Sequence, residues 1–141
     1  MSTQENKALV RRFYAELAQR NLDATFALLA ADYTLWLSPG VSRNRTQLRQ
    51  AAETWLKAFP DLNATIEEMI AEGERVVSRL VWRGTHRGVW EYGVYGPVQP
   101  TGSTFEVVAV NIVRIADGYI AEEWEVFDYL ALARQLGEMA R

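Results

Sequence analysis

The chain has 141 residues, 49% of them apolar, which is enough for one packed core in a single domain spanning residues 1–141. Cysteine is absent, which excludes disulfides, thiolate metal ligands and a cysteine nucleophile. The formal net charge is −3, and charges of both signs are dispersed along the chain. We therefore expect no nucleic-acid partner and no binding to anionic membranes.

The first twelve residues are polar and charged and contain no apolar stretch of the signal-peptide type. No run approaches the ~20 apolar residues that a membrane span requires. Together with the lack of cysteine, these features predict a cytoplasmic protein. His86 is the single histidine, so we expect no histidine-based metal site.

Helical periodicity dominates the first sixty residues. Apolar residues at four-residue spacing form a stripe on the first helix, and Asn21 or Asp23 is the expected cap of the second helix. A Ser-Pro-Gly sequence at 38–40 ends a short strand, and Pro60 ends the third helix. The expected elements are helices over residues 4–20, 24–30 and 48–59, and a strand over 33–37.

The second half of the chain has the two-residue periodicity of strands. Asp117 and Gly118 form a strong hairpin signal, and the Gly- and Pro-rich segment 93–102 predicts a loop at the rim of the sheet. Helices followed by strands indicate an α+β domain whose helices pack on one face of an antiparallel sheet. The expected strands cover residues 62–66, 75–85, 105–115 and 119–127, and a last helix covers 128–137.

Side chains alternate between the two faces of a strand, so parity predicts which residues point inward. The odd-numbered residues of 105–115 are apolar except Asn111, and we place them on the cavity side. The even set then puts Val108, Val110 and Ile112 on the outer face, where such a patch predicts a homodimer through the sheet.

The returning strand, residues 119–127, leaves its orientation open. Its odd set contains Glu123 and Glu125, and its even set contains Trp124 and Val126. Alternation alone allows either set to face the core. On the strand over 75–85, parity continued to His86 places that side chain on the inner side.

Several short segments resemble one known family in order and spacing over nearly the whole chain. They are NKALVRRFY at 6–14, AFPDL at 58–62, IAEG at 70–73 with RVV at 75–77, GTHRG at 84–88, PTG at 100–102, and the stretch from RIADG at 114–118 through Trp124 and Asp128 to RQLG at 134–137. Together they resemble the SnoaL-like polyketide cyclase family.

The resemblance implies a nuclear transport factor two-like cone, in which a curved antiparallel sheet surrounds a pocket that helices cover. It also implies intramolecular aldol closure of polyketide rings, without cofactor or metal, by a carboxylate on the last long strand. By position that carboxylate is Glu125, where the family usually has aspartate. Asn111 stands where cyclases have a pocket histidine, Glu123 where many have histidine, and Leu35 and Trp36 replace an aspartate–histidine pair.

The resemblance thus makes Glu125 the expected acid/base group, and an apolar pocket should raise its pKa. The Asn111 amide could bond Glu125 or a substrate oxygen. His86 is a further catalytic candidate, either as a base at the rim or as a turn residue that bonds nearby backbone. The side chains expected to contact a flat apolar or aromatic ligand are Phe13, Leu17, Trp36, Trp55, Phe59, Trp82, Tyr92 and Phe105.

Three functions remain open at this point. The first is a cofactor-independent cyclase or isomerase, and the second is a non-catalytic ligand-binding or accessory protein with the same pocket. The third is an epoxide hydrolase of the same fold, which needs an inward arginine between two carboxylates. It ranks last because Arg79, Arg83 and Arg114 all have outward parity.

Overall fold

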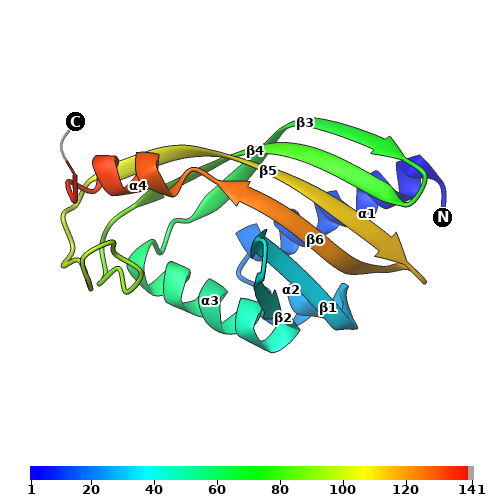
Figure 1. The fold of residues 1–141 in the computed structure, drawn as a ribbon, viewed down its shortest axis with the longest axis horizontal. Helices are drawn as coiled ribbons and strands as arrows, with labels where there is room; N and C mark the ends of the chain where they lie inside the picture. Colours follow the sequence, from blue (N-terminus) through cyan, green and yellow to red (C-terminus); the bar gives the residue numbers. More distant parts are fainter. Residues whose placement is uncertain (140–141) are drawn as a thin grey trace.

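A computed structural model of the chain describes residues 1–139 and shows helices packed against one side of a curved six-stranded sheet (Figure 1). The strand order is β2-β1-β6-β5-β4-β3. The α+β cone expected from the sequence is confirmed. The elements are α1 (Thr3–Ala18), α2 (Leu22–Ala27), β1 (Leu29–Ser38), β2 (Val41–Asn44), α3 (Arg45–Ala58), β3 (Asn63–Glu72), β4 (Arg75–Thr85), β5 (Thr104–Ala116), β6 (Tyr119–Phe127) and α4 (Tyr129–Gln135).

One strand pair departs from the antiparallel expectation. β1 and β6 run parallel, whereas every other neighbouring pair in the sheet is antiparallel. The chain leaves the β1–β2 hairpin through α3, builds β3 to β5, and returns with β6 beside β1. A parallel pair needs a long crossover of this kind, which local sequence patterns do not reveal.

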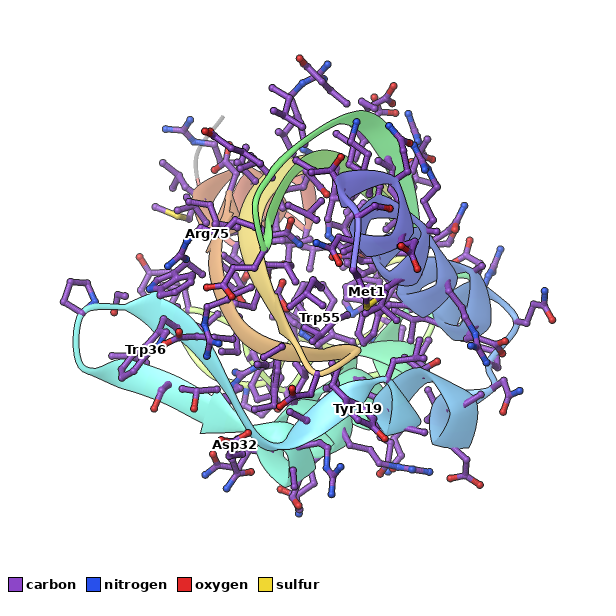
Figure 2. All side chains as sticks on the ribbon, turned by 90° about the vertical axis from the view of Figure 1, so that its right-hand side faces the viewer. Met1, Asp32, Trp36, Trp55, Arg75 and Tyr119 are labelled. Atoms are coloured by element: carbon purple, nitrogen blue, oxygen red, sulfur yellow. The ribbon has the colours of Figure 1, made fainter. Side chains whose placement is uncertain are left out.

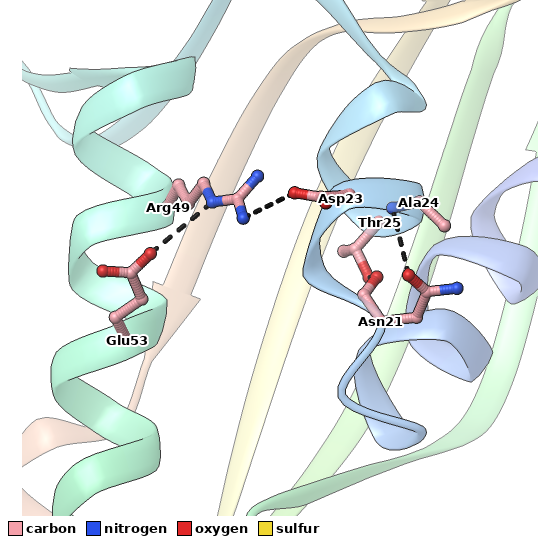
Figure 3. A network of polar contacts seen from close by, with 6 residues as sticks. All are labelled: Asn21, Asp23, Ala24, Thr25, Arg49 and Glu53. Carbon is pink, nitrogen blue, oxygen red and sulfur yellow. Dashed lines mark hydrogen bonds and ion pairs between the residues drawn. The ribbon is translucent and has the colours of Figure 1, made fainter.

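Short polar side chains begin the helices. Ser2 and Glu5 form a reciprocal capping box at the start of α1, and Asn21 caps α2 by accepting from the Ala24 amide at 3.5 Å. Asp23, the other expected cap, instead accepts from Arg49 of α3 at 2.7 Å, as Figure 3 shows. This exposed ion pair contributes little stability, but it links α2 to α3.

The β5 side chains alternate as expected. Phe105, Val107, Ala109, Asn111, Val113 and Ile115 are buried, whereas Val108, Val110 and Ile112 are 48%, 41% and 38% exposed on the outer face. The register pairs Asn111 with Glu125 and Val113 with Glu123 across the β5–β6 hairpin. Directly paired residues share a face of the sheet, so both glutamates of β6 point inward. The structure thus resolves the orientation that alternation left open.

The interior contains two apolar clusters. One lies beneath α1 and includes Val10, Phe13 and Leu80, and the other surrounds Phe59 near the α4 end of the sheet. Trp82 and Phe127 pack against both clusters, so the cavity described below lies where the clusters meet.

Within residues 1–139, none of the helices combines the length and the apolar character needed to cross a membrane.

Candidate active site

A cavity opens between α1, α3 and the inner face of the sheet, and most of the side chains that line it are apolar. Four of the residues expected to contact a ligand line it: Phe13, Leu17, Trp55 and Trp82. Trp55 lies in the interior, between the sheet and the helices (Figure 2). The lining residues with hydroxyl or charged groups are Tyr14, Arg43, Glu123, Glu125 and Tyr129.

The other four expected contacts do not line the cavity, and these assignments are corrected. Trp36 lies in the outer part of the β1–β2 hairpin (Figure 2), where its indole N–H donates to Glu122 at 3.0 Å. Phe59 and Phe105 pack on each other in the second apolar cluster, with ring centroids 4.8 Å apart. Tyr92 is 43% exposed in the loop after β4.

Glu123 lines the cavity and is only 7% exposed. The Tyr33 hydroxyl donates to its Oε1 at 2.7 Å, and the Asn111 amide donates to its Oε2 at 3.0 Å. Burial raises the pKa of the Glu123 carboxyl, and these two donors oppose that rise because they stabilise its charged form. Glu123 is therefore the anchored carboxylate of the site.

The same network corrects the role expected of Asn111. Its amide nitrogen donates to the Tyr14 hydroxyl at 2.7 Å and to Glu123, not to its cross-strand partner Glu125. Asn111 is fully buried behind the cavity lining, so its amide does not reach a substrate oxygen directly. It instead positions Tyr14 and Glu123, which do line the cavity.

Glu125 lines the cavity and is partly buried, and its carboxyl makes no hydrogen bond or ion pair with residues 1–139. Burial and the nearby Glu123 charge raise its pKa to about 8, while Arg43 acts in the opposite direction. Two carboxyls two residues apart on β6 thus differ in role, because one is bonded into the wall and the other remains available to a ligand.

Tyr14 presents a hydroxyl to the same cavity. Its oxygen accepts from Asn111, and its own O–H has no acceptor within the described chain. Burial and the two glutamates raise the pKa of Tyr14 well above its usual value of 10.0, so the phenol stays protonated. Tyr14 can therefore donate a hydrogen bond to a ligand oxygen.

His86 lies outside the cavity lining, and its assignment as a catalytic base is corrected. The ring is fully buried beside Phe59, and its Nδ1 accepts from the Thr101 amide at 3.2 Å and lies 3.0 Å from the Thr101 hydroxyl. Burial lowers the pKa of His86, which favours the neutral ring. His86 holds the 98–103 segment against the end of β4, which is the structural alternative that the sequence offered.

Arg43 is the charged cavity residue that the sequence interpretation missed. The expected outward arginines do face outward, where Arg79, Arg83 and Arg114 pair with Glu68, Glu106 and Glu122 at 3.5, 3.1 and 3.2 Å. Arg43 is on β2, a four-residue strand beyond the Pro-Gly turn, and pairs with inward-facing Leu35. The signal that could have found it is the alternation of the first strand, because continuing that alternation past the turn at residue 40 places residue 43 on the inner face.

Among the described residues, no group of three or more aspartate, glutamate or histidine side chains is arranged to hold a metal ion.

Comparison with known proteins identifies the family of this chain. The model of the SnoaL-like polyketide cyclase family matches residues 8–136. The aklanonic acid methyl ester cyclase DnrD of Streptomyces peucetius is 33% identical over 145 residues, covering 98% of this chain and 93% of that protein. The chain therefore belongs to the SnoaL-like polyketide cyclase family.

Solved structures agree with this assignment. AclR from Streptomyces galilaeus, described as a candidate hydroxylase, superposes with a TM-score of 0.87 at 28% identity, covering 99% of this chain and 100% of AclR. IdmH from Streptomyces antibioticus, described as a candidate polyketide cyclase, gives 0.79 at 29% identity, covering 94% of this chain and 98% of IdmH. These comparisons show that the chain has the cone fold and belongs to a family that includes cyclases.

Proposed function

We propose that this protein is a cofactor-independent cyclase that closes a ring in a small, largely apolar polyketide-like ketone by intramolecular aldol addition. The observation that carries the proposal is the state of Glu125, an inward carboxyl in an apolar cavity with a pKa near 8 and no competing partner within residues 1–139. Proton transfer is most effective when the pKa of the catalytic group lies near the working pH.

The reaction needs two proton transfers. The carboxylate form of Glu125 removes a proton from the carbon next to one carbonyl, and the resulting enolate carbon attacks a second carbonyl of the same molecule. Glu125, now protonated, gives the proton to the oxygen that gains charge as the new bond forms. The carboxylate is regenerated, and the product is an isomer of the substrate.

The neighbouring groups support each step. Tyr14 can donate to the enolate oxygen, because Asn111 occupies only the acceptor side of its hydroxyl. Glu123 raises the proton affinity of Glu125, which makes Glu125 a stronger base than an ordinary carboxylate. The apolar wall formed by Phe13, Trp55 and Trp82 excludes water that would otherwise protonate the enolate.

A non-catalytic ligand-binding protein is the alternative that uses the same cavity. Structural likeness alone does not fix the reaction, because a solved structure of the same fold, AclR, is described as a candidate hydroxylase. Epoxide hydrolysis would need an inward arginine between two carboxylates, and Arg43 does line the cavity. However, Arg43 forms no ion pair with Glu123 or Glu125 within the described chain. The available Glu125 carboxyl, which has no arginine bridge, favours ring closure over both alternatives.

The test is Glu125→Gln, which keeps the shape of the side chain and removes its basicity. With a panel of linear and partly cyclised aromatic polyketones, the variant should lose at least about a hundredfold in kcat with ligand affinity retained. Glu106→Gln, on the outer face of β5, is the matched control and should leave turnover unchanged. Unaltered turnover in Glu125→Gln, or no turnover by the native protein on any panel member, would contradict the proposal.

We also infer a homodimer through the outer sheet face, which is supported by the exposed valines and isoleucine of β5. A cytoplasmic location likewise remains our proposal.

A further inference from the structure

Arg43 is a cation built into the wall of the cavity. It pairs with Leu35 across the β1–β2 hairpin, and Leu35 pairs with Glu123 on β6, so the three side chains share the inner face. Both Arg43 and Glu125 line the cavity, and the Arg43 charge acts on the pKa of Glu125.

The guanidinium is also held in place. The Tyr92 ring lies 5.6 Å from its central carbon in a cation–π arrangement. Tyr92 in turn packs edge-on against the fully buried Trp90, with ring centroids 5.2 Å apart. A planar cation supported on one side by an aromatic ring presents its N–H groups with less loss of side-chain freedom than an unsupported one.

No acidic group among residues 1–139 neutralises this cation. Arg43 makes no ion pair and no hydrogen bond in that range and instead contacts the Tyr92 ring, whereas Arg79, Arg83 and Arg114 are all paired. The Glu123 oxygens are occupied by Tyr33 and Asn111. Glu125 carries a proton for most of the time near neutral pH because its pKa is about 8. The other ionisable neighbours of the cavity, Tyr14 on α1 and Tyr129 on α4, have raised pKa values and stay neutral.

We propose that Arg43 is an anion-binding group and that the substrate is a ketone bearing a carboxylate, which the guanidinium holds at the cavity mouth. This inference rests on the proposed function, because it names the class of substrate that Glu125 would act on. Arginine matches the two oxygens of a carboxylate with two parallel N–H donors, which fixes the orientation of the ligand as well as its position. The polyketide-like body of the ligand then lies along the apolar wall, with its reacting carbons toward Glu125 and Tyr14.

The arrangement couples ligand charge to the protonation of Glu125. A bound carboxylate cancels the Arg43 charge that lowers the pKa of Glu125, so the pKa should rise further. By reciprocity, affinity for the carboxylate should fall as pH rises through about 8, because ionised Glu125 repels it. An uncharged ligand of the same shape should show neither effect.

The experiment compares an anthraquinone carboxylate with the carboxamide substituted at the same ring position, using quenching of tryptophan fluorescence. The native protein should bind the carboxylate about tenfold more tightly, and Arg43→Met should reduce that ratio to within about twofold. Arg43→Lys should keep an intermediate preference. Arg12→Met changes the net charge equally on the exposed face of α1 and should leave the preference intact. Circular dichroism and thermal midpoints confirm that each variant is folded.

A second measurement follows the pH dependence of carboxylate binding. Affinity should fall between about pH 7 and pH 10 in the native protein and stay level over that range in Glu125→Gln. Equal binding of the two probes by the native protein, or an undiminished preference in Arg43→Met, overturns the inference. In that case, loss of turnover in Glu125→Gln would still leave the cyclase proposal standing. Carboxylate selectivity without turnover on any substrate would support the anion site and reject the cyclase.

Discussion

Glu123 and Glu125 have the same side chain on the same face of one strand, and their surroundings give them different roles. Glu123 is tied by Tyr33 and Asn111, both of which stabilise its charge. Glu125 has no such donors among the described residues. Burial and the Glu123 charge raise its pKa. A fixed charge beside an available carboxyl is a common way to obtain a base that works near neutral pH.

The pH dependence of turnover follows from this pair. The reaction starts from ionised Glu125, so kcat/KM should rise with pH, pass its midpoint near pH 8 and level off above it. Glu123→Gln removes the neighbouring charge, which lowers the pKa of Glu125 and should move the rise to lower pH. Glutamine can still accept from Asn111 and donate to the Tyr33 oxygen. A pH–rate profile measures both midpoints. An unchanged midpoint in Glu123→Gln would show that burial alone sets the Glu125 pKa.

Ionisation of Glu125 should also lower the stability of the protein. Stability should therefore fall as pH rises, whereas turnover should increase. A carboxyl whose folded pKa lies above its unfolded value of 4.5 loses stabilisation as pH rises from about 4.5 to about 8. Glu125→Gln should therefore raise the free energy of unfolding by about 1–3 kcal/mol at alkaline pH and change it little near pH 4.5. Urea unfolding at the two pH values measures the difference. A variant that is destabilised at alkaline pH would indicate a favourable partner for ionised Glu125.

At this scale the sequence predicts some site residues and misses others. Glu125 could be placed only through family position, because strand alternation fits either face of β6. His86 has the expected inward parity, but the strand ends at Thr85, so its ring enters the packing around Phe59 instead of the cavity. Arg43 was missed because a four-residue edge strand carries too little periodicity to be recognised.

The loop after β4 docks on the end of α3 through backbone contacts. The amides of Arg87 and Gly88 both donate to the Ala58 carbonyl, at 2.9 and 3.1 Å. A Cβ at Gly88 would collide with the Lys57 carbonyl oxygen, so a side chain cannot be accommodated without moving the loop or the helix. This contact positions the segment that carries Tyr92.

Gly88→Ala should lower the free energy of unfolding by about 1–3 kcal/mol, because backbone atoms must shift to relieve the collision. Displacement of Tyr92 should also weaken carboxylate binding at Arg43. Chemical denaturation and the fluorescence titration measure the two effects. Gln99→Ala, an exposed change in the same loop, is the control. Native-like stability of Gly88→Ala would show that this loop does not depend on its contact with α3.

Local sequence predicts the type and bounds of an element better than it predicts which strands are neighbours in the sheet. β4, β5 and β6 lie within a residue or so of their expected bounds, because long alternating runs and the Asp117–Gly118 turn define them. β3 extends to Glu72, well beyond the expected end at residue 66, and continues past the shift in its register with β4 near Ile66. The parallel β1–β6 pairing joins segments about ninety residues apart and depends on the whole fold.

For the whole molecule, the outer sheet face presents an apolar row that crosses several strands. The register joins Ile70, Val77, Ile112, Trp124 and Trp36 in sequence across the sheet. The adjacent pair of Val110 and Val126 is 41% and 75% exposed. On this face Arg79, Arg83 and Arg114 are paired with glutamates, whereas Arg75 stacks over the Trp124 ring, 5.4 Å from its centroid. A second copy of the sheet packing here would therefore leave Arg75 as the outer arginine of β4 and β5 without a carboxylate partner among the described residues.

The native protein should therefore migrate at about twice its chain mass of 16.0 kDa at micromolar concentration. Val110→Glu should give monomers, because a two-fold interface buries the new charge on both copies and sets the two charges near each other. Tyr95→Glu is the control, since Tyr95 is 81% exposed in the loop away from the sheet face. Size-exclusion chromatography with light scattering measures the mass. The cavity opens on the inner face of the sheet, so the monomeric variant should keep its affinity for the anthraquinone carboxylate. A native monomer at tens of micromolar, or a dimer that persists in Val110→Glu, would show that this face is not the interface.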